Sequence, residues 1–536
     1  MPSKAITDST PPRSGGSWRD QSEAGPSMMR SDDPNIARTL GLIGAAAIVF
    51  GGMALLLQTT GRPTPMGFGW AVFLLAAGMG ALLFHAAFDG DIQIRRLYMA
   101  FGYCCLVIGG FLAVVPYNKQ PGSLFGQGYL CLFLGLLFLL AFLRNEVEPR
   151  WRNATEIVLG SVGAAMALVG FIGSNIKSDF SMPIGSLLAI LGAIYLTAFI
   201  GSRGIETDNA YRVGWGIGAI GALAFLVVLG RSLIPPLLYR WQWTQIAPDN
   251  YFRSYGALLA ALGVLYVCIS VLLCSENGLI VLTRRELGSL FFSPIAYILL
   301  FVYVIAHWLA YIWPVWVMLS DEPFSQEPIV REFILQLTAV ISTIIAVPVL
   351  TMRLVSEEKR SGTLEVLLTA PVDETIVVVS KFLAAFVMYL AMWIPFGLFL
   401  AYLRVAGGSP FDYRPLFSFT IGQLAIGAAF IAMGTFFSCL SRNQVASGIL
   451  TFGGMLFLTV VYFFGRLVGR QASLSTEPAR SALDTFQAVL NHVSYIDVWL
   501  DTLEGKLYLR SVVFFVSLAV VWLFLSVKVI EARKWT

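Results

Sequence analysis

The chain has 536 residues, of which 57% are hydrophobic and only 13% are charged. Soluble domains carry roughly 25% charged residues, so this composition excludes a soluble globular protein. The formal net charge of +4 says little about partners, because the placement of Lys and Arg matters more than their sum in a membrane protein.

Residues 1–36 differ from the rest of the chain. They are rich in Ser, Pro, Gly, Asp and Arg, and they lack the apolar core of a signal peptide. Such a segment cannot bury enough apolar surface to fold. We therefore expect a disordered cytoplasmic tail.

Apolar stretches recur along the remainder of the chain, and a spanning helix needs about 20 apolar residues. The sequence predicts an all-α, polytopic transmembrane bundle of about 14 spans. The expected spans are 37–58, 70–88, 97–115, 124–142, 155–172, 182–200, 211–230, 255–274, 294–317, 333–352, 380–403, 418–439, 444–464 and 512–530.

The distribution of Lys and Arg predicts the orientation of these spans. With the amino terminus inside, the short cytoplasmic segments hold most of the basic residues, so both termini are expected in the cytoplasm. Residues 234–250 then have to lie outside, although arginines surround them. Their two prolines and their aromatic residues favour a surface or re-entrant segment. The expected location is the cell inner (cytoplasmic) membrane, which the chain crosses many times.

Composition divides the spans into two regions. Residues 37–276 form a predicted bundle of about eight helices, rich in Gly and Ala, and no motif in it indicates a chemistry or a role. Its run Gly214-Trp-Gly-Ile-Gly218 has the spacing of small residues that lets membrane helices pack closely. Residues 277–536 hold the other six spans and all the motifs described next.

The second region opens with a predicted amphipathic helix at residues 277–293. Arg284, Arg285 and Glu286 interrupt an otherwise apolar pattern, which favours a helix lying on the cytoplasmic membrane surface. Pro294 follows and suits the first turn of the next span. The pattern alone leaves open whether this helix does more than hold the chain at the membrane.

A cytoplasmic segment at residues 353–381 joins two spans. A mixed-charge run at 357–360 has to lie in water or against a polar partner. Gly362 should end the helix that precedes it, and residues 363–368 can form a short helix that ends near Pro371. Asp373 is then placed to cap the following helix. The pattern fits a knob that enters a groove on a partner protein, and it equally fits an ordinary loop.

The string from Glu357 to Val372, EEKRSGTLEVLLTAPV, resembles the cytoplasmic signature of ABC-2-type exporter permeases. The upstream residues 285–287 and 293–297 resemble the entry helix of the same family. The resemblance covers residues 277–536, which we expect to form a six-span permease domain. The subgroup it resembles most is the permease of the gliding-motility-associated ABC transporter.

The resemblance implies a coupling helix that docks on a separate ABC ATPase subunit, with ATP and Mg bound by that subunit. It also implies a second permease domain, in a homodimer or a heterodimer, with the lipid bilayer around both and no nucleic-acid partner. The implied coupling residues are Glu357, Glu358, Arg360, Gly362, Thr363, Leu364, Glu365, Leu367, Leu368 and Pro371. The implied entry helix includes Arg284, Arg285, Glu286 and Pro294.

The sequence offers no chemistry of its own. It contains no GxxxxGK[ST] loop to hold nucleotide phosphates, and we predict no catalytic, cofactor or metal site. The main alternative is an ion- or proton-driven secondary transporter, for which His85 and His307 are the ionisable candidates within the spans. A membrane-embedded enzyme is a third hypothesis, which the lack of clustered acidic and histidine residues disfavours.

Overall fold

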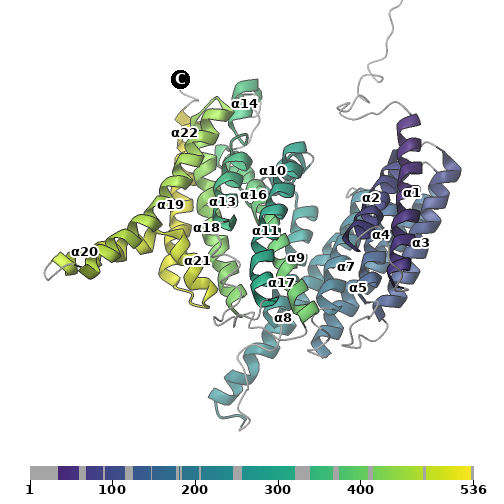
Figure 1. The fold of residues 1–536 in the computed structure, drawn as a ribbon, viewed down its shortest axis with the longest axis horizontal. Coiled ribbons are helices and arrows are strands. Elements are labelled where there is room, and N and C mark those ends of the chain that lie inside the picture. The colour runs from purple at the N-terminus through teal and green to yellow at the C-terminus, as the bar shows by residue number, and fades with distance from the viewer. Residues whose placement is uncertain are drawn as a thin grey trace, which may run out of the picture. The chain divides into compact units, whose positions relative to one another are not determined.

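The computed structural model describes residues 34–59, 68–88, 91–114, 125–146, 148–176, 180, 184–204, 207–244, 256–291, 293–319, 338–365, 373–407, 414–474 and 479–532 (Figure 1). Within these ranges the regular elements are helices, without strands. Fourteen of the helical segments are long and apolar enough to cross a membrane, which confirms the all-α fold and the predicted number of spans. The orientation of the termini stays a prediction.

Internal contacts divide the chain into two units, Met1–Ser161 and Val162–Thr536. In the first unit, α1 packs on α2, and α3 packs on α4. Its helices are α1 (Pro34–Thr59), α2 (Phe68–Phe88), α3 (Ile92–Val114), α4 (Phe125–Asn145) and the start of α5 (Pro149–Ile176). Because α1 begins at Pro34, the last three residues of the predicted tail are helical. The tail before them lies outside the described residues.

The second unit begins with the rest of α5 and continues with α7 (Ser186–Arg203), α8 (Asp208–Arg240) and α9 (Gly256–Cys274). Helix α8 has 33 residues, a length of about 50 Å at 1.5 Å per residue, whereas a bilayer core is about 30 Å thick. It continues through Pro235 and Pro236 without ending. Residues 234–240 therefore extend the helix beyond its predicted end at 230, and their position outside the membrane stays a prediction.

Helices α8 and α9 touch at small residues. A methyl group added at Gly221 would lie 2.6 Å from the carbonyl oxygen of Gly263, and one added at Gly218 would meet the side chain of Ser270. Gly216 lies on the same helix but faces open space. The backbones approach this closely because Gly221 and Gly263 face each other without side chains, the kind of contact that small residues allow between membrane helices.

The remaining helices form the part of the second unit that contains the sequence motifs. One continuous hydrophobic core joins residues of α11, α13, α16, α18, α21 and α22. The elements are α10 (Gly278–Phe291), α11 (Pro294–Leu319), α13 (Thr338–Thr351), α14 (Ser356–Ser361), α16 (Glu374–Met392), α17 (Ile394–Gly407), α18 (Arg414–Leu440), α19 (Gln444–Leu474), α20 (Ala479–Val493), α21 (Tyr495–Leu503) and α22 (Leu509–Ala532).

The predicted span 380–403 differs from the structure in two ways. Helix α16 begins six residues earlier, at Glu374, and it ends at Met392, so that Trp393 separates it from α17. Pro395 lies in the first turn of α17. A proline has no N–H to donate to the preceding turn, and its ring clashes with the carbonyl four residues earlier, which accounts for the break.

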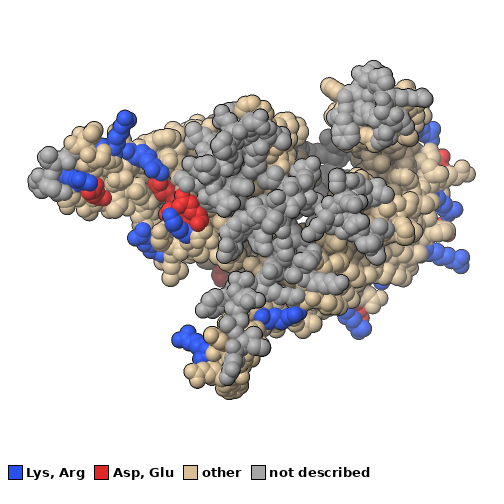
Figure 2. Space-filling view, turned by 60° about the horizontal axis from the view of Figure 1, so that its bottom comes forward, with Lys and Arg blue, Asp and Glu red and all other residues tan. Residues whose placement is uncertain are grey.

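Helices α20 and α21 lie on the side of this bundle away from α14 (Figure 1). Figure 2 shows acidic and basic side chains gathered over this region. Several of these charges pair with one another, for example Arg466 with Asp497 at 3.5 Å and Lys506 with Glu504 at 2.7 Å. Ion pairs therefore balance part of the charge at this end.

The α8–α9 contact gives a direct test of the packing. We expect Gly221→Ala to destabilise the protein by roughly 1–3 kcal/mol, because the new methyl group overpacks against backbone that cannot move aside. Gly216→Ala is the matched control and should be close to neutral. The thermal unfolding midpoints of both variants in detergent measure the difference, and equal midpoints would contradict the packing described here.

Candidate functional site

Helix α10 is held to α9, which precedes it in the chain, and to α16, which lies beside it in space. At its start, the side chain of Asn277 accepts a hydrogen bond from the Leu279 N–H at 3.0 Å, which satisfies a free donor of the first turn. Arg284 donates to the carbonyl of Leu273 at 2.9 Å, near the carboxyl end of α9. One side of α10 packs along α16. The helix predicted at 277–293 is confirmed, and its position at a membrane surface stays a prediction.

The chain turns sharply after α13. Residues 352–355 form a turn, α14 follows from Ser356 to Ser361, and Gly362 ends it with φ = 75°. Glycine adopts this left-handed conformation without strain and commonly terminates helices. The predicted break at Gly362 is confirmed.

Helix α14 is fixed to the end of α18. The Ser438 hydroxyl accepts hydrogen bonds from the backbone N–H groups of Val355 and Ser356, at 3.0 and 3.1 Å. This hydroxyl does for α14 what a capping side chain usually does, because it satisfies the free donors at the start of the helix. Lys359 donates to the carbonyl of Cys439, near the carboxyl end of α18. Both contacts restrict the orientation of α14, which begins the predicted knob at residues 357–371.

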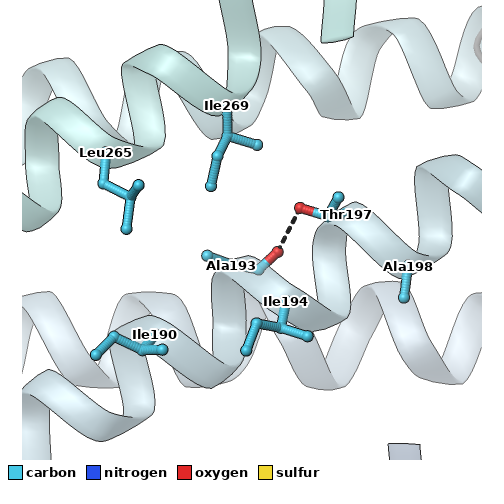
Figure 3. Close-up of a pocket in the computed structure, with 7 residues that line it drawn as sticks. All are labelled: Ile190, Ala193, Ile194, Thr197, Ala198, Leu265 and Ile269. Atoms are coloured by element: carbon cyan, nitrogen blue, oxygen red, sulfur yellow. Dashed lines mark hydrogen bonds between the residues drawn. The ribbon is translucent and has the colours of Figure 1, made fainter. Parts of the chain in front are cut away.

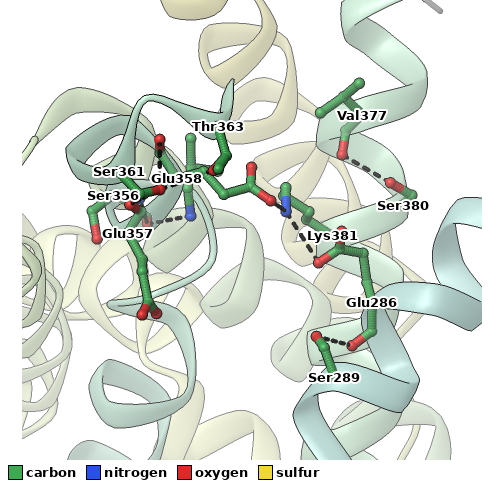
Figure 4. A network of polar contacts seen from close by, with 12 residues as sticks. Glu286, Ser289, Ser356, Glu357, Glu358, Ser361, Thr363, Val377, Ser380 and Lys381 are labelled. Carbon is green, nitrogen blue, oxygen red and sulfur yellow. Dashed lines mark hydrogen bonds and ion pairs between the residues drawn. The ribbon is translucent and has the colours of Figure 1, made fainter. Parts of the chain in front are cut away.

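A buried lysine joins α14 to α10 and α16. The ammonium group of Lys381, on α16, lies 2.6 Å from a carboxylate oxygen of Glu358 and 3.0 Å from one of Glu286 (Figure 4). Only 1% of the lysine side chain is exposed, against 20% and 15% for the two carboxylates. We call these three residues the lysine cluster. It carries one formal negative charge in excess and ties three elements that are far apart in the sequence.

The other side chains of the knob divide between inward and outward positions. Glu357 accepts two hydrogen bonds from Arg353, at 2.7 and 2.9 Å, and Leu364 is buried in the hydrophobic core. Arg360 and Glu365 are exposed. The knob therefore presents a small charged surface, while its remaining charges hold it to its own domain.

The structure brings together part of the predicted site. Glu357, Glu358, Arg360, Gly362, Thr363, Leu364 and Glu365 share one compact segment, and Glu286 of the entry helix reaches it through the lysine cluster. Of the other entry-helix residues, Arg284 holds α10 to α9, Arg285 is exposed, and Pro294 begins α11. Leu367, Leu368 and Pro371 lie outside the described residues.

One detail of the prediction needs correction. Asp373 occupies the position before α16, as expected, but its side chain makes no capping hydrogen bond. The charged run at 357–360 does lie in water or against polar partners, and the partner of Glu358 is Lys381 of the same chain. The sequence analysis missed the roles of Lys381 and Ser438. A lysine within the apolar stretch 376–389 is the signal that could have found the first of them, since a buried ammonium needs a carboxylate.

Other candidate sites offer less chemistry. A groove of about 380 Å³ between α7 and α9 is apolar, and the one hydroxyl at its wall, on Thr197, is bonded to the carbonyl of Ala193 at 2.7 Å (Figure 3). The two membrane histidines lie in different units. His85 is hydrogen-bonded to Tyr98 at 2.8 Å, and His307 to the carbonyl of Tyr303 at 2.9 Å.

Comparison with known families agrees with this geometry. Residues 314–528 match the family model described as ABC-2 family transporter protein. This region is similar to ABC-2 transporters, and we call it, together with α10 and α11 that pack on it, the ABC-2 domain. The match covers α13 to α21 and most of α22, so the ABC-2 domain includes the knob and the break between α16 and α17. No curated protein and no solved structure matches the chain.

The lysine cluster predicts a strong and specific effect on the stability of the ABC-2 domain. Lys381→Met leaves two partly buried carboxylates without a counter-charge, which should cost about 3 kcal/mol, the lower end of the range for breaking a buried pair. Adding Glu286→Gln and Glu358→Gln should restore much of this loss, because the uncompensated charge is then gone.

Thermal unfolding of the purified variants measures both effects. The matched control is Lys528→Met, at an exposed lysine that pairs with Glu531 on the surface of α22 and should change stability by less than about 1 kcal/mol. If Lys381→Met is no worse than this control, the cluster does not hold the knob in place.

Proposed function

We propose that this chain is the membrane-spanning permease subunit of an ATP-driven ABC exporter, and that the knob at residues 357–371 docks on a separate ATPase subunit. The supporting observation is the way in which the knob is mounted. Contacts to α10, α16 and α18 hold its first helix, α14, and the exposed charged side chains of its described part, Arg360 and Glu365, remain available to a partner.

This mounting suits the transmission of force. A docking element that moved freely would absorb a displacement of the ATPase, whereas one fixed to three helices passes it on. In the proposed mechanism, ATP closes a pair of partner ATPase subunits, the knob follows, and α10 and α16 tilt with it. ATP and Mg would be bound by the partner. Pumping follows only if the ATP-bound partner favours one conformation of this chain over the other.

The remaining parts of the proposal follow from the family. A second permease domain, from another copy of this chain or from a different chain, would complete the path across the bilayer. The cell inner membrane would be the location, with the knob in the cytoplasm. The similarity of the motif to the gliding-motility-associated subgroup indicates a lineage and is not evidence for a role in motility.

A secondary transporter is the less favoured function. Coupling to protons or ions requires ionisable groups that change state within the membrane. Both histidines make hydrogen bonds of structural character, to a tyrosine hydroxyl and to a backbone carbonyl one turn away. Neither of these contacts is with a carboxylate.

Affinity purification of the tagged chain, with mass spectrometry of the co-purifying proteins and an ATPase assay, tests the proposal. We expect an ABC-type ATPase subunit to co-purify with the wild-type chain. Combining Arg360→Glu with Glu365→Lys should reduce its recovery several-fold, because both exposed charges of the knob are reversed while its internal contacts remain.

The control is Arg480→Glu, which reverses an exposed charge on α20, on the side of the bundle away from the knob. It should leave recovery of the ATPase unchanged. Equal recovery with the knob variant and the control would exclude docking through this segment. Purification of the chain without any ATPase, under conditions that preserve ABC complexes, would reject the exporter function.

A further inference from the structure

A cluster of aromatic rings fills the ABC-2 domain on the side away from the knob. The ring centroids of His307 and Trp393 are 5.2 Å apart, those of Trp393 and Trp499 5.6 Å, and those of Trp499 and Tyr495 5.2 Å. These rings come from α11, from the break between α16 and α17, and from α21. We call this group the aromatic cluster; its members are His307, Trp393, Phe396, Phe419, Tyr495 and Trp499.

Several polar atoms in and beside the aromatic cluster are buried without a hydrogen-bond partner among the described residues. The indole nitrogen of Trp393 is one of them, and it lies next to the hydroxyl of Tyr389. The other three are the indole nitrogen of Trp499, Nε2 of His307 and the amide oxygen of Gln423, on residues that are 0%, 3% and 4% exposed. Gln423 lies one turn after Phe419 on the same face of α18, and its amide nitrogen donates to the hydroxyl of Tyr389 at 2.6 Å. An unpaired polar group is costly in a protein interior, and a group of them calls for an explanation.

The three atoms offer one donor and two acceptors. The indole N–H of Trp499 can only donate, and the amide oxygen of Gln423 can only accept. Nδ1 of His307 lies 2.9 Å from the carbonyl oxygen of Tyr303, so Nδ1 carries the proton, and Nε2 of the neutral ring is an acceptor. Hydroxyl groups both donate and accept, so they match this set. None of the six members of the aromatic cluster is Lys, Arg, Asp or Glu, which disfavours a charged ligand.

Access to these atoms requires the helices to part, because the rings pack against each other. Trp393 lies at the break between α16 and α17, where the proline interrupts the hydrogen bonds of the helix. A break of this kind lets one part of a helix move relative to the other. The ring of Trp393 lies between those of His307 and Trp499. It is therefore placed at the break, where the two helical parts can move relative to each other.

We propose that the aromatic cluster binds an uncharged, hydroxyl-bearing group of the transported molecule, such as a sugar or glycerol head group. Aromatic faces would contact the C–H surface of the group, and the three polar atoms would bind its hydroxyls. The proposal rests on the transport function proposed above, and it names the substrate class that the membrane path accepts.

Binding of n-hexyl β-D-glucoside to the full chain in lipid nanodiscs tests the proposal without any ATPase. We expect a saturable rise in the thermal unfolding midpoint with hexyl glucoside and none with hexanol at the same concentrations. Trp499→Phe, which keeps a ring but removes the N–H, should weaken binding about fivefold, the effect of one ordinary hydrogen bond. Gln423→Met should weaken binding by a similar factor. With two variants, the test remains valid if one of them fails to fold.

The matched control is Trp522→Phe, which changes a tryptophan of α22 that packs on Phe436 and Phe437 outside the aromatic cluster. It should bind hexyl glucoside as the wild type does. Three results would each overturn the proposal: no saturable shift in the wild type, an equal shift with hexanol, or lower stability of both variants with unchanged affinity, which would indicate buried water at these atoms. ATPase recovery is measured separately, so the two proposals fail independently.

Discussion

The ammonium group of Lys381 is the point on which the architecture of the ABC-2 domain depends. A buried charge is tolerated only when it is paired, and this one is paired twice, with Glu358 on α14 and Glu286 on α10. The three elements therefore cannot separate without exposing charge to an apolar surrounding. The knob begins with α14, and the membrane helix that follows it is α16. The lysine cluster therefore fixes the position of the knob relative to the membrane helices α10 and α16.

Polar groups are distributed unevenly along the ABC-2 domain. Near the knob, the charge of Lys381 is buried and paired, and backbone donors of α14 are capped by Ser438. On the other side, the buried polar atoms are uncharged and lie among aromatic rings. An end held by ion pairs and an end whose buried polar atoms are uncharged suit a protein that receives force at one side and changes its packing at the other. Small residues such as Gly221 serve a different purpose, close contact between neighbouring helices.

Sequence reasoning predicted the elements of this fold better than their contacts. Apolar stretches predicted the fourteen spans because each span has to satisfy its own backbone in lipid, and Gly362 predicted the end of α14 because few other residues adopt its conformation. The partners of Lys381 could not be predicted, since Glu286 and Glu358 are distant in the sequence and only packing brings them together. The extension of α8 through two prolines was missed because proline usually ends a helix, whereas neighbouring groups can compensate for it in membranes.

The most direct test of the account is whether α10 and α14 move together. Spin labels at Ser289→Cys and Ser361→Cys, in a background without the native cysteines, report the distance between these helices in the complex with its ATPase. A second pair, at Ser361→Cys and Thr485→Cys, reports movement of the knob relative to α20. We predict that ATP changes the second distance and leaves the first unchanged. A change in the first distance, or no change in either, would contradict a knob that transmits force through the lysine cluster.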